Sequence, residues 1–232
     1  MIRQRLGKDL LFFDGGMGTL LQEKGLAPGE LPETWNLTHS EEIYKIHRQY
    51  IEAGSDIILT NTFGANALKF HDDSCSLEEI IKAAVSHVKK AEREALLQTG
   101  DERKIYTALD VGPTGKLLKP MGDLEFETAY EAFKEVVILG EQAGADLIHI
   151  ETMSDTYELK AAVLAAKENT SLPVFATVIF DERKKLLTGA DVSSVVALLE
   201  GLGVDALGIN CAMGPKEMLP VLELSLIHIS EP

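Results

Sequence analysis

A mostly apolar run that ends in polar residues occurs three times along the chain. The copies span residues 54–62, 144–152 and 203–211. In each copy a Gly lies two residues before an Asp, and a polar residue (Asn61, Glu151 or Asn210) lies five residues after it. A run of this length after a helix-ending Gly is typical of a buried parallel strand. The repeat therefore predicts three strands whose polar carboxyl ends meet at one edge of a sheet.

Strand and helix patterns alternate along the rest of the chain. In chain order, the expected strands are 10–13, 56–63, 105–110, a fourth ending at 151, 173–180 and a sixth ending at 211. Helix starts are indicated by Ser40, by the Ser76–Glu79 capping box and by Pro215. Such alternation predicts a parallel sheet with right-handed crossovers, either a barrel or a doubly wound sheet.

The spacing of the strands limits the architecture. The first strand starts near residue 11 and the sixth near residue 206, so two further units of the same length would extend beyond residue 232. An eight-stranded barrel needs those two units. We therefore expect either an open six-stranded sheet or a (β/α)8 TIM-type barrel truncated after about six βα units.

The C-terminal segment 224–232 resembles the translation of a sequencing-library adapter. We expect one barrel domain over residues 1–223, incomplete at its C-terminus, followed by a non-native tail over 224–232. The alternative is an ordinary C-terminal helix, because Leu222, Leu226 and Ile229 would share one helical face.

Composition narrows the classes of function. The chain of 232 residues is 45% hydrophobic, enough for one α/β domain. Its 22 basic and 37 acidic residues give a net charge of -15, which argues against nucleic acid as a partner. No apolar stretch is long enough to cross a membrane, and the first residues lead into no signal-peptide core. Two cysteines form no disulfide framework, so we expect a cytoplasmic protein.

Asp14 follows the first expected strand and begins a glycine-rich turn. The glycines at 15, 16 and 18 do not match a dinucleotide-binding fingerprint, because Leu21 occupies the place of the third spaced glycine. A carboxylate followed by bare backbone suits a ligand with an ammonium and a carboxylate, held by Asp14 and by the N–H groups of the turn at Gly15. The alternative is a tight turn in which Asp14 caps a helix.

Glu151 ends an expected strand, and by alternation it shares a face with Leu147 and His149. A carboxylate there is costly unless it meets a cation or hydrogen-bond donors. We interpret Glu151 as an anchor for a substrate amine or as a general base, against the alternative of a salt bridge to a neighbouring strand. His149, one layer deeper, is expected to be a hydrogen-bonded core histidine rather than a ligand.

Cys211 ends the third copy of the repeat. Free cysteines are commonly small buried hydrophobes, and as a zinc ligand this one would need at least two more protein ligands. Cys75 is expected to be an incidental loop thiol. Asn210 and Cys211 are adjacent, so both can face one site only at a bulge or beyond the end of the strand.

Five motifs in order resemble the homocysteine S-methyltransferase family, and especially the homocysteine-binding domain of cobalamin-dependent methionine synthases. They are residues 14–19, 56–65, 112–115, 151–152 and 208–211, and the likeness extends over about residues 8 to 223. The resemblance implies a (β/α)8 barrel that holds zinc through three cysteines. Cys211 matches the first of these, and the Gly-Gly-Cys-Cys segment that would supply the other two is not in the sequence.

The resemblance also assigns roles to the other candidates. Asp14 and Glu151 match the carboxylates that hold the homocysteine amine, and the turn at Gly15 would bind its carboxylate. Asn61 and Asn210 are expected at the rim of the site or behind the residues that touch substrate. A zinc-bound homocysteine thiolate would accept the methyl group, with Cys211 as metal ligand in the catalytic centre.

The methyl donor implied by the resemblance is methylcobalamin, recharged from 5-methyltetrahydrofolate on separate cobalamin- and folate-binding domains. Betaine or S-methylmethionine is the alternative donor. Two other hypotheses stay open: a barrel lyase or aldolase with Glu151 as base, and a truncated barrel that is not catalytic. With two cysteine ligands missing, we expect the 232-residue chain itself to be inactive.

Overall fold

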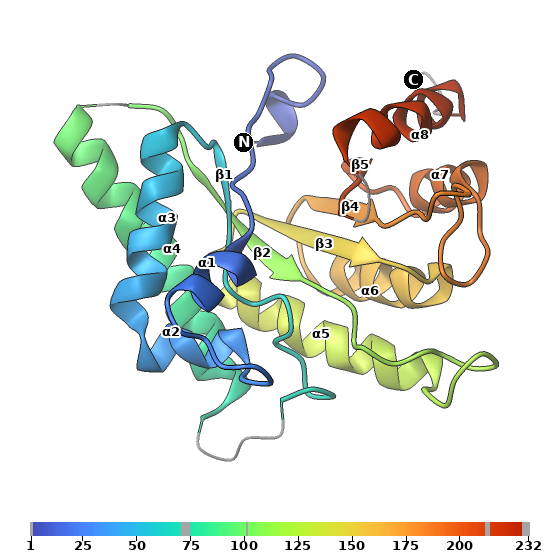
Figure 1. Cartoon of the computed structure of the whole chain (residues 1–232), viewed down its shortest axis with the longest axis horizontal. Coiled ribbons are helices and arrows are strands. Elements are labelled where there is room, and N and C mark those ends of the chain that lie inside the picture. The colour runs from blue at the N-terminus through green and yellow to red at the C-terminus, as the bar shows by residue number, and fades with distance from the viewer. Residues whose placement is uncertain (1, 71–74, 101, 212–213, 229–232) are drawn as a thin grey trace.

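The computed structural model describes residues 2–70, 75–100, 102–211 and 214–228. A five-stranded sheet lies at the centre of this part of the chain, and its parallel strands follow one another in sequence order (Figure 1). The strands are β1 (Ile57–Leu59), β2 (Tyr106–Val111), β3 (Leu147–Met153), β4 (Val174–Val178) and β5 (Ala206–Ile209). A doubly wound sheet would reverse its order at a switch point, so the sequential order favours the barrel pattern. Among the described residues β1 and β5 do not pair, and the sheet is open.

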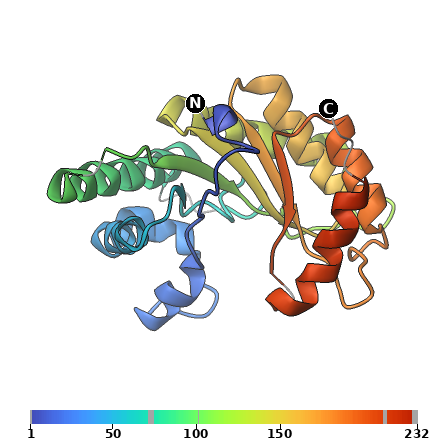
Figure 2. The same ribbon diagram turned by 90° about the horizontal axis from the view of Figure 1, so that it is seen from above.

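Helices lie around the outside of the curved sheet, and the blue N-terminal helices and the red α8 lie on opposite sides of it (Figure 2). Two short helices and two 3-10 turns precede β1: η1 (Ile2–Gln4), α1 (Met17–Glu23), η2 (Pro32–Thr34) and α2 (Trp35–Thr38). The longer helices are α3 (Ser40–Ala53), α4 (Leu77–Thr99), α5 (Phe126–Ala143), α6 (Thr156–Asn169), α7 (Val192–Gly201) and α8 (Pro215–His228). The predicted Ser76 capping box begins α4: the Glu79 N–H donates to Ser76 Oγ at 3.2 Å.

Alternation along the strands divides the apolar side chains between two layers. Leu109 and Ile148 belong to the large cluster under the helices, together with Phe133 of α5. Their neighbours Ala108 and Leu147 face the inside of the curve, in a smaller cluster. The sheet is therefore apolar on both faces, as expected for parallel strands of a barrel, and polar residues reach the inner face at the carboxyl ends of the strands.

The glycines of the repeat act as the sequence predicts. Gly54, Gly144 and Gly203 follow α3, α5 and α7, with φ values of 113°, 96° and 67°. This left-handed conformation strongly favours glycine and ends each helix before the next strand begins.

The Asp of each repeat has a structural role that the sequence analysis did not assign. The N–H groups of Phe12, Thr107 and Val174 donate to the carboxylates of Asp56, Asp146 and Asp205 at 3.0, 2.9 and 2.9 Å. In return, the three Asp N–H groups donate to the carbonyls of the same residues at 2.7, 2.8 and 2.8 Å. We call this reciprocal pair of bonds the Asp latch. Each latch joins the start of one strand to the neighbouring segment, at the end of the sheet opposite the polar carboxyl ends.

The expected first strand, 10–13, is not a strand in the structure. It contributes one bridge, between Phe13 and Ile57, while Leu10 and Phe12 are 77% and 55% exposed. The segment nevertheless lies beside β1 and accepts the latch of Asp56. The expected six-stranded count is therefore corrected to five strands and a bridged segment among the described residues, because Leu10 and Phe12 have too little packing to extend the ladder.

Other strands also end elsewhere than expected: β4 ends at Val178 and β5 at Ile209, each two residues early. β1 stops at Leu59. Beyond it the Thr60 N–H still donates to the Ala108 carbonyl at 2.9 Å, but hydroxyls make the next contacts: the Asp110 N–H donates to Thr60 Oγ1 at 3.1 Å, and Thr62 Oγ1 donates to the Asp110 carbonyl at 2.7 Å. β3 continues past Glu151 to Met153 with a shift of register.

The expected boundary at Glu223 falls inside α8, which continues to His228. Residues 229–232 of the expected tail lie outside the described residues, so the tail stays a prediction. In the part of the chain that the structure describes, no helix is long and apolar enough to cross a membrane.

Candidate active site

A cavity of about 450 Å³ opens where the carboxyl ends of β1, β2, β3 and β5 meet the glycine turn before α1. Its lining includes Asp14, Gly15, Gly16, Glu33, Asn61, Asp110, Glu151, Thr152, Asn210 and Cys211. Every site residue predicted from the sequence is in this group. None of the described lining residues is Lys or Arg, so the Schiff-base lysine needed by an aldolase is not found here.

Asp14 has one anchored and one unpartnered carboxylate oxygen. The Leu59 N–H donates to Oδ2 at 3.0 Å, while Oδ1 is buried and has no hydrogen-bond partner among the described residues. The turn that follows lies so close to α3 that a Cβ at Gly15 would be 2.8 Å from the Tyr50 hydroxyl. The structure therefore presents a free carboxylate oxygen beside bare backbone, as the sequence analysis expected.

Glu151 projects from the inner face of β3 toward the same cavity. Asn210 Nδ2 donates to its Oε2 at 3.2 Å. Below it, His149 is 5% exposed and lines a second inner cavity of about 380 Å³, with Phe13 and Phe175. His149 is buried as predicted, but the expected hydrogen bond is not there: Nδ1 has no partner in the described part, and Nε2 lies 3.8 Å from Glu151 Oε2. Burial lowers the pKa of His149 to about 4, so its ring is neutral at pH 7.

Two further carboxyl groups, which were not predicted from the sequence, also reach the cavity. Asp110 ends the inner face of β2 and is 6% exposed, and Glu33 lies in η2 and is 2% exposed. Asp110 Oδ1 and Glu33 Oε2 are buried without a hydrogen-bond partner among the described residues. The alternation that selected Glu151 also selects Asp110, two residues after Ala108, whereas no sequence signal pointed to Glu33.

The surroundings of the four carboxyl groups in this cavity disfavour their ionised forms. Burial raises the pKa of Asp14 to about 8, the Leu59 N–H opposes the rise, and Glu151 adds to it. Burial also raises the pKa of Asp110 well above its usual range, and Glu151, Asp14 and Glu33 add to this effect. Burial raises the pKa values of Glu151 and Glu33 as well. A bound cation would relieve this cost, so the cavity suits a positively charged group.

Asn61 lines the cavity, but its amide is bonded away from the carboxylates. Its Nδ2 donates to the Pro32 carbonyl at 2.8 Å and to Asn36 Oδ1 at 3.2 Å. Asn36 Nδ2 donates in turn to the Asn61 carbonyl at 2.8 Å. In this structure Asn61 thus fixes η2 and α2 against the end of β1.

Asn210 and Cys211 both reach the cavity because β5 has already ended at Ile209. Cys211 has a φ of 58°, and Thr152, at the matching place in the second repeat, has a φ of 60°. Left-handed backbone is uncommon for residues other than glycine. These two turns resolve the expected conflict of direction between neighbours in a regular strand.

The described residues do not complete a zinc site. They contain no cluster of three His, Cys, Asp or Glu side chains able to hold a metal ion. Cys211 is exposed at the cavity, whereas Cys75 lines a separate hollow with His39 and Leu37. One thiol therefore stands at the cavity where a three-cysteine site would need three.

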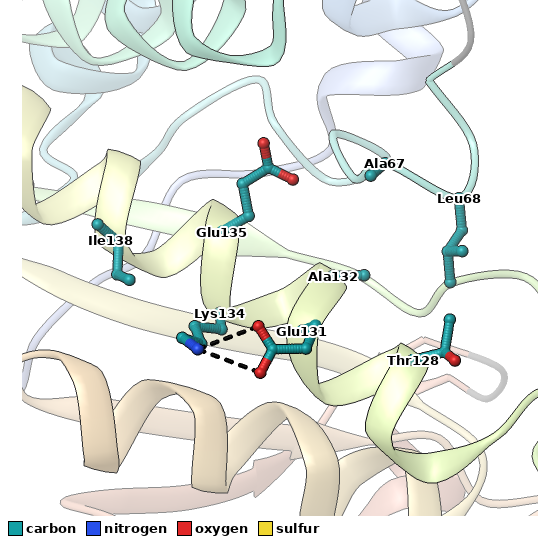
Figure 3. A pocket seen from close by; sticks show the side chains of 8 residues that line it. All are labelled: Ala67, Leu68, Thr128, Glu131, Ala132, Lys134, Glu135 and Ile138. Carbon is teal, nitrogen blue, oxygen red and sulfur yellow. Dashed lines mark hydrogen bonds and ion pairs between the residues drawn. The ribbon is translucent and has the colours of Figure 1, made fainter.

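A larger hollow, of about 490 Å³, lies on the outer surface of the molecule. It is lined by one side of α5 and by Ala67 and Leu68, and its polar lining includes the ion pair between Lys134 and Glu131 (Figure 3). None of the predicted site residues lies there. Lys134 and Glu131 pair with each other there, and Glu135, the remaining charged side chain of this lining, is exposed to solvent, in contrast to the buried carboxyl groups of the inner cavity.

Comparisons with known proteins identify the family of the chain. The model of the family described as homocysteine S-methyltransferase matches residues 11–230. The chain is 33% identical over 226 residues to methionine synthase from Mycobacterium leprae, covering 93% of this chain and 19% of that protein. It is 34% identical over 224 residues to methionine synthase from Mycobacterium tuberculosis, with 92% and 19% covered. The chain thus spans about a fifth of the length of these relatives.

Solved structures of the homocysteine methyltransferase MmuM from Escherichia coli are also similar. The apo form is 25% identical with a TM-score of 0.78, covering 94% of this chain and 78% of that one. The metallated form is 23% identical with a TM-score of 0.85, covering 96% and 82%. The resemblance stated from the five motifs is therefore confirmed, and the chain belongs to the homocysteine S-methyltransferase family.

Proposed function

We propose that this chain binds homocysteine and presents its thiol for methylation to methionine. The observation that carries the proposal is the buried, unpartnered oxygen of Asp14 beside the Gly15 turn, in a cavity that also contains Glu151. An α-amino acid carries an ammonium and a carboxylate one carbon apart. The acidic side chains suit the first group, and backbone N–H groups suit the second.

Each residue has a separate role in this proposal. Asp14 and Glu151 bind the ammonium, which draws both carboxyl groups into their ionised form. Gly15 keeps the turn against Tyr50, where a side chain would not fit, and its backbone N–H would bind the substrate carboxylate. The homocysteine side chain then points toward the rim at Cys211, where its sulfur can meet a methyl donor.

Zinc dependence is part of the proposal only as far as the residues allow. Cys211 would be one ligand, and two further thiolates would have to come from sequence outside this chain, because Cys75 lines a different hollow. A metal held in this way keeps a bound thiol deprotonated at neutral pH. The residues of this chain would hold the amino acid in place whether or not a metal is bound.

The methyl donor is proposed from the relatives. Methionine synthases match the chain over most of its length, which supports methylcobalamin and 5-methyltetrahydrofolate as donors, on cobalamin- and folate-binding domains or a partner. Betaine or S-methylmethionine is the alternative. Transfer from each donor to homocysteine, assayed with the complete gene product, separates these possibilities.

Titration calorimetry of the chain with L-homocysteine tests the amino-acid site directly. We expect binding that weakens about tenfold or more in Asp14→Asn and Glu151→Gln, because each loses a charge-assisted hydrogen bond. 4-Mercaptobutanoic acid, which has no ammonium, should bind no better than the variants bind homocysteine. Asp9→Asn is the control, because Asp9 pairs with Arg5 at the surface.

Equal binding of homocysteine by all these proteins would contradict the proposed site. Binding without methyl transfer by the complete gene product would instead support the hypothesis of a barrel that is not catalytic.

A further inference from the structure

The side chain of Asn210 touches three groups at the cavity that come from two strand ends. Its Nδ2 lies 2.8 Å from Thr152 Oγ1, 3.2 Å from Glu151 Oε2 and 3.6 Å from Cys211 Sγ, and its two hydrogens are shared among these three acceptors. Glu151 and Thr152 belong to β3, while Cys211 follows β5. A single amide thus contacts both the carboxylate proposed for the amine and the exposed thiol at the rim.

The direction of these bonds is fixed by a fourth contact. The Thr152 N–H donates to Asn210 Oδ1 at 3.2 Å, so that atom must be the amide oxygen. The other end of the side chain is therefore the NH₂ group, and it acts only as a donor. Glu151 and Cys211 both receive from it.

The two residues that lie on either side of the Asn210 amide have an unusual backbone conformation. Thr152 and Cys211, with φ values of 60° and 58°, turn left-handed at matching positions of the repeat. Such backbone is strained for residues other than glycine and persists where its surroundings hold it. Asn210 bonds both the N–H and the hydroxyl of Thr152, and so joins the two turns to each other.

We propose that Asn210 is a positioning residue that fixes the spacing between the Glu151 carboxylate and the Cys211 thiol, and thereby selects the length of the amino-acid side chain that the site accepts. The inference rests on the proposed function, in which Glu151 receives the ammonium. The distance in the ligand between its ammonium, bound at Glu151, and its reacting atom at the rim must match the spacing that the Asn210 amide sets. Cysteine, one methylene shorter than homocysteine, would not reach both places.

Alkylating ammonium compounds measure this span without any metal or methyl donor. In 2-bromoethylammonium and 3-bromopropylammonium, the Cys211 sulfur displaces bromide, so that a C–S bond forms as the C–Br bond breaks. 2-Bromoethanol and 3-bromopropanol are the neutral controls of equal length. Peptide mass analysis measures the alkylation rates of Cys211 and Cys75 in the same sample. At each thiol the rate with the ammonium compound is divided by the rate with the alcohol, which removes the intrinsic reactivity of that thiol from the comparison.

In the unaltered chain we expect a rate ratio at Cys211 that exceeds the ratio at Cys75 by about tenfold for one of the two lengths, as one charge-assisted hydrogen bond would give. Asn210→Asp keeps an oxygen for the Thr152 N–H but loses the donor to Glu151 and Cys211. Asn210→Ala loses every contact. Both variants should lose the preference for one length. Asn169→Ala should keep it, because the Asn169 amide bonds Tyr130 of α5 and Ala165 of α6.

The possible outcomes separate the two proposals. Should the unaltered chain show no ammonium preference at Cys211, the carboxylate site itself is absent and the proposed function fails. Should that preference appear and persist with the same length in Asn210→Asp and Asn210→Ala, the positioning role of Asn210 is overturned. Circular dichroism of each variant shows whether the fold is kept, and Asn210→Asp provides the test if Asn210→Ala does not fold.

Discussion

Asp14 holds a proton that an ordinary aspartate would have lost. Its pKa is raised from about 3.8 to about 8, mainly by burial, so the folded chain binds more protons than the unfolded chain between these values. Stability therefore falls as the pH rises through this window, the reverse of an aspartate in a salt bridge. The structure thus stores unfavourable free energy at the site until a cation arrives.

The pH dependence of unfolding reports this stored cost. Urea titrations from pH 5 to pH 9 should show the free energy of unfolding decreasing with pH, with a slope of up to about 1.4 kcal/mol per pH unit for one group. Asp14→Asn should reduce the slope, since the amide does not ionise. An unchanged slope in this variant would show that Asp14 does not titrate in the window.

Ligand binding should reverse that protonation. A docked ammonium favours the ionised form of Asp14, so binding of homocysteine at pH 7 should release protons. Calorimetry in two buffers with different ionisation enthalpies measures their number. We expect release in the unaltered chain and less in Asp14→Asn. Proton uptake, or equal release by the two proteins, would contradict the assignment of the amine to this carboxylate.

The strand starts are stabilised by the same carboxylate contact three times. Asp146 shows it most completely: its carboxylate accepts from the Thr107 N–H at 2.9 Å and from Lys89 Nζ at 2.6 Å. Burial alone would raise the pKa of Asp146, but these bonds outweigh it and lower the pKa. Its stabilising effect is consequently present above the unfolded pKa and lost as the pH falls through the folded one.

Removing a latch should destabilise the sheet. Asp146→Ala leaves the Thr107 N–H without its side-chain acceptor, and we expect a loss of about 1–3 kcal/mol in the free energy of unfolding. Asp123→Ala, at an exposed position, is the matched control and should change little. Urea unfolding at pH 7 distinguishes them, and equal stability of the two variants would mean that the latch contributes nothing net.

The repeat made some elements predictable and left others unmarked. Its Gly and apolar run gave the positions of β1, β3 and β5, and its polar ends gave Glu151 and Asn210. Neither β2 nor β4 carries the repeat, so Asp110 was overlooked even though its strand was expected. Glu33 could not be found at all, because only tertiary contacts bring η2 to the sheet.

The pattern also overestimated regular structure at the edges. The apolar run 10–13 looks like a strand in sequence, but periodicity does not show whether a neighbour will cover Leu10 and Phe12. Thr60 and Thr62 continue the β1 pattern, yet the strand ends at Leu59 and their hydroxyls bond the β2 backbone. Strand ends depend on such contacts, which a one-dimensional pattern does not contain.

Across the whole molecule, burial is greatest at the middle strands of the sheet. All six residues of β2 are buried, whereas all four residues of β5 are only half-buried. In the described part of the chain, β5 pairs with one strand, β4. Protection from hydrogen exchange rises with burial and pairing. We therefore expect stability to decrease from β2 and β3 toward β5.

Hydrogen–deuterium exchange measured by mass spectrometry checks this gradient. Peptides from β2 and β3 should exchange slowest, and peptides from β5 should exchange at least about tenfold faster, in line with a local opening that costs less than global unfolding. The measurement should be repeated at two protein concentrations. Protection of β5 equal to that of β3 would mean that its outer edge is covered, and a rise with concentration would identify a second copy as the cover.

The Asp latches and the cavity occupy opposite ends of the same strands. The starts of these strands are therefore attached without the groups that face the ligand, although at the carboxyl ends Asp14 also accepts the Leu59 N–H. A laboratory effort to change the accepted substrate could diversify Asp14, Asp110 and Glu151 together while Asp56, Asp146 and Asp205 stay fixed. The fraction of such a library that still folds would measure how far the architecture separates robustness from evolvability.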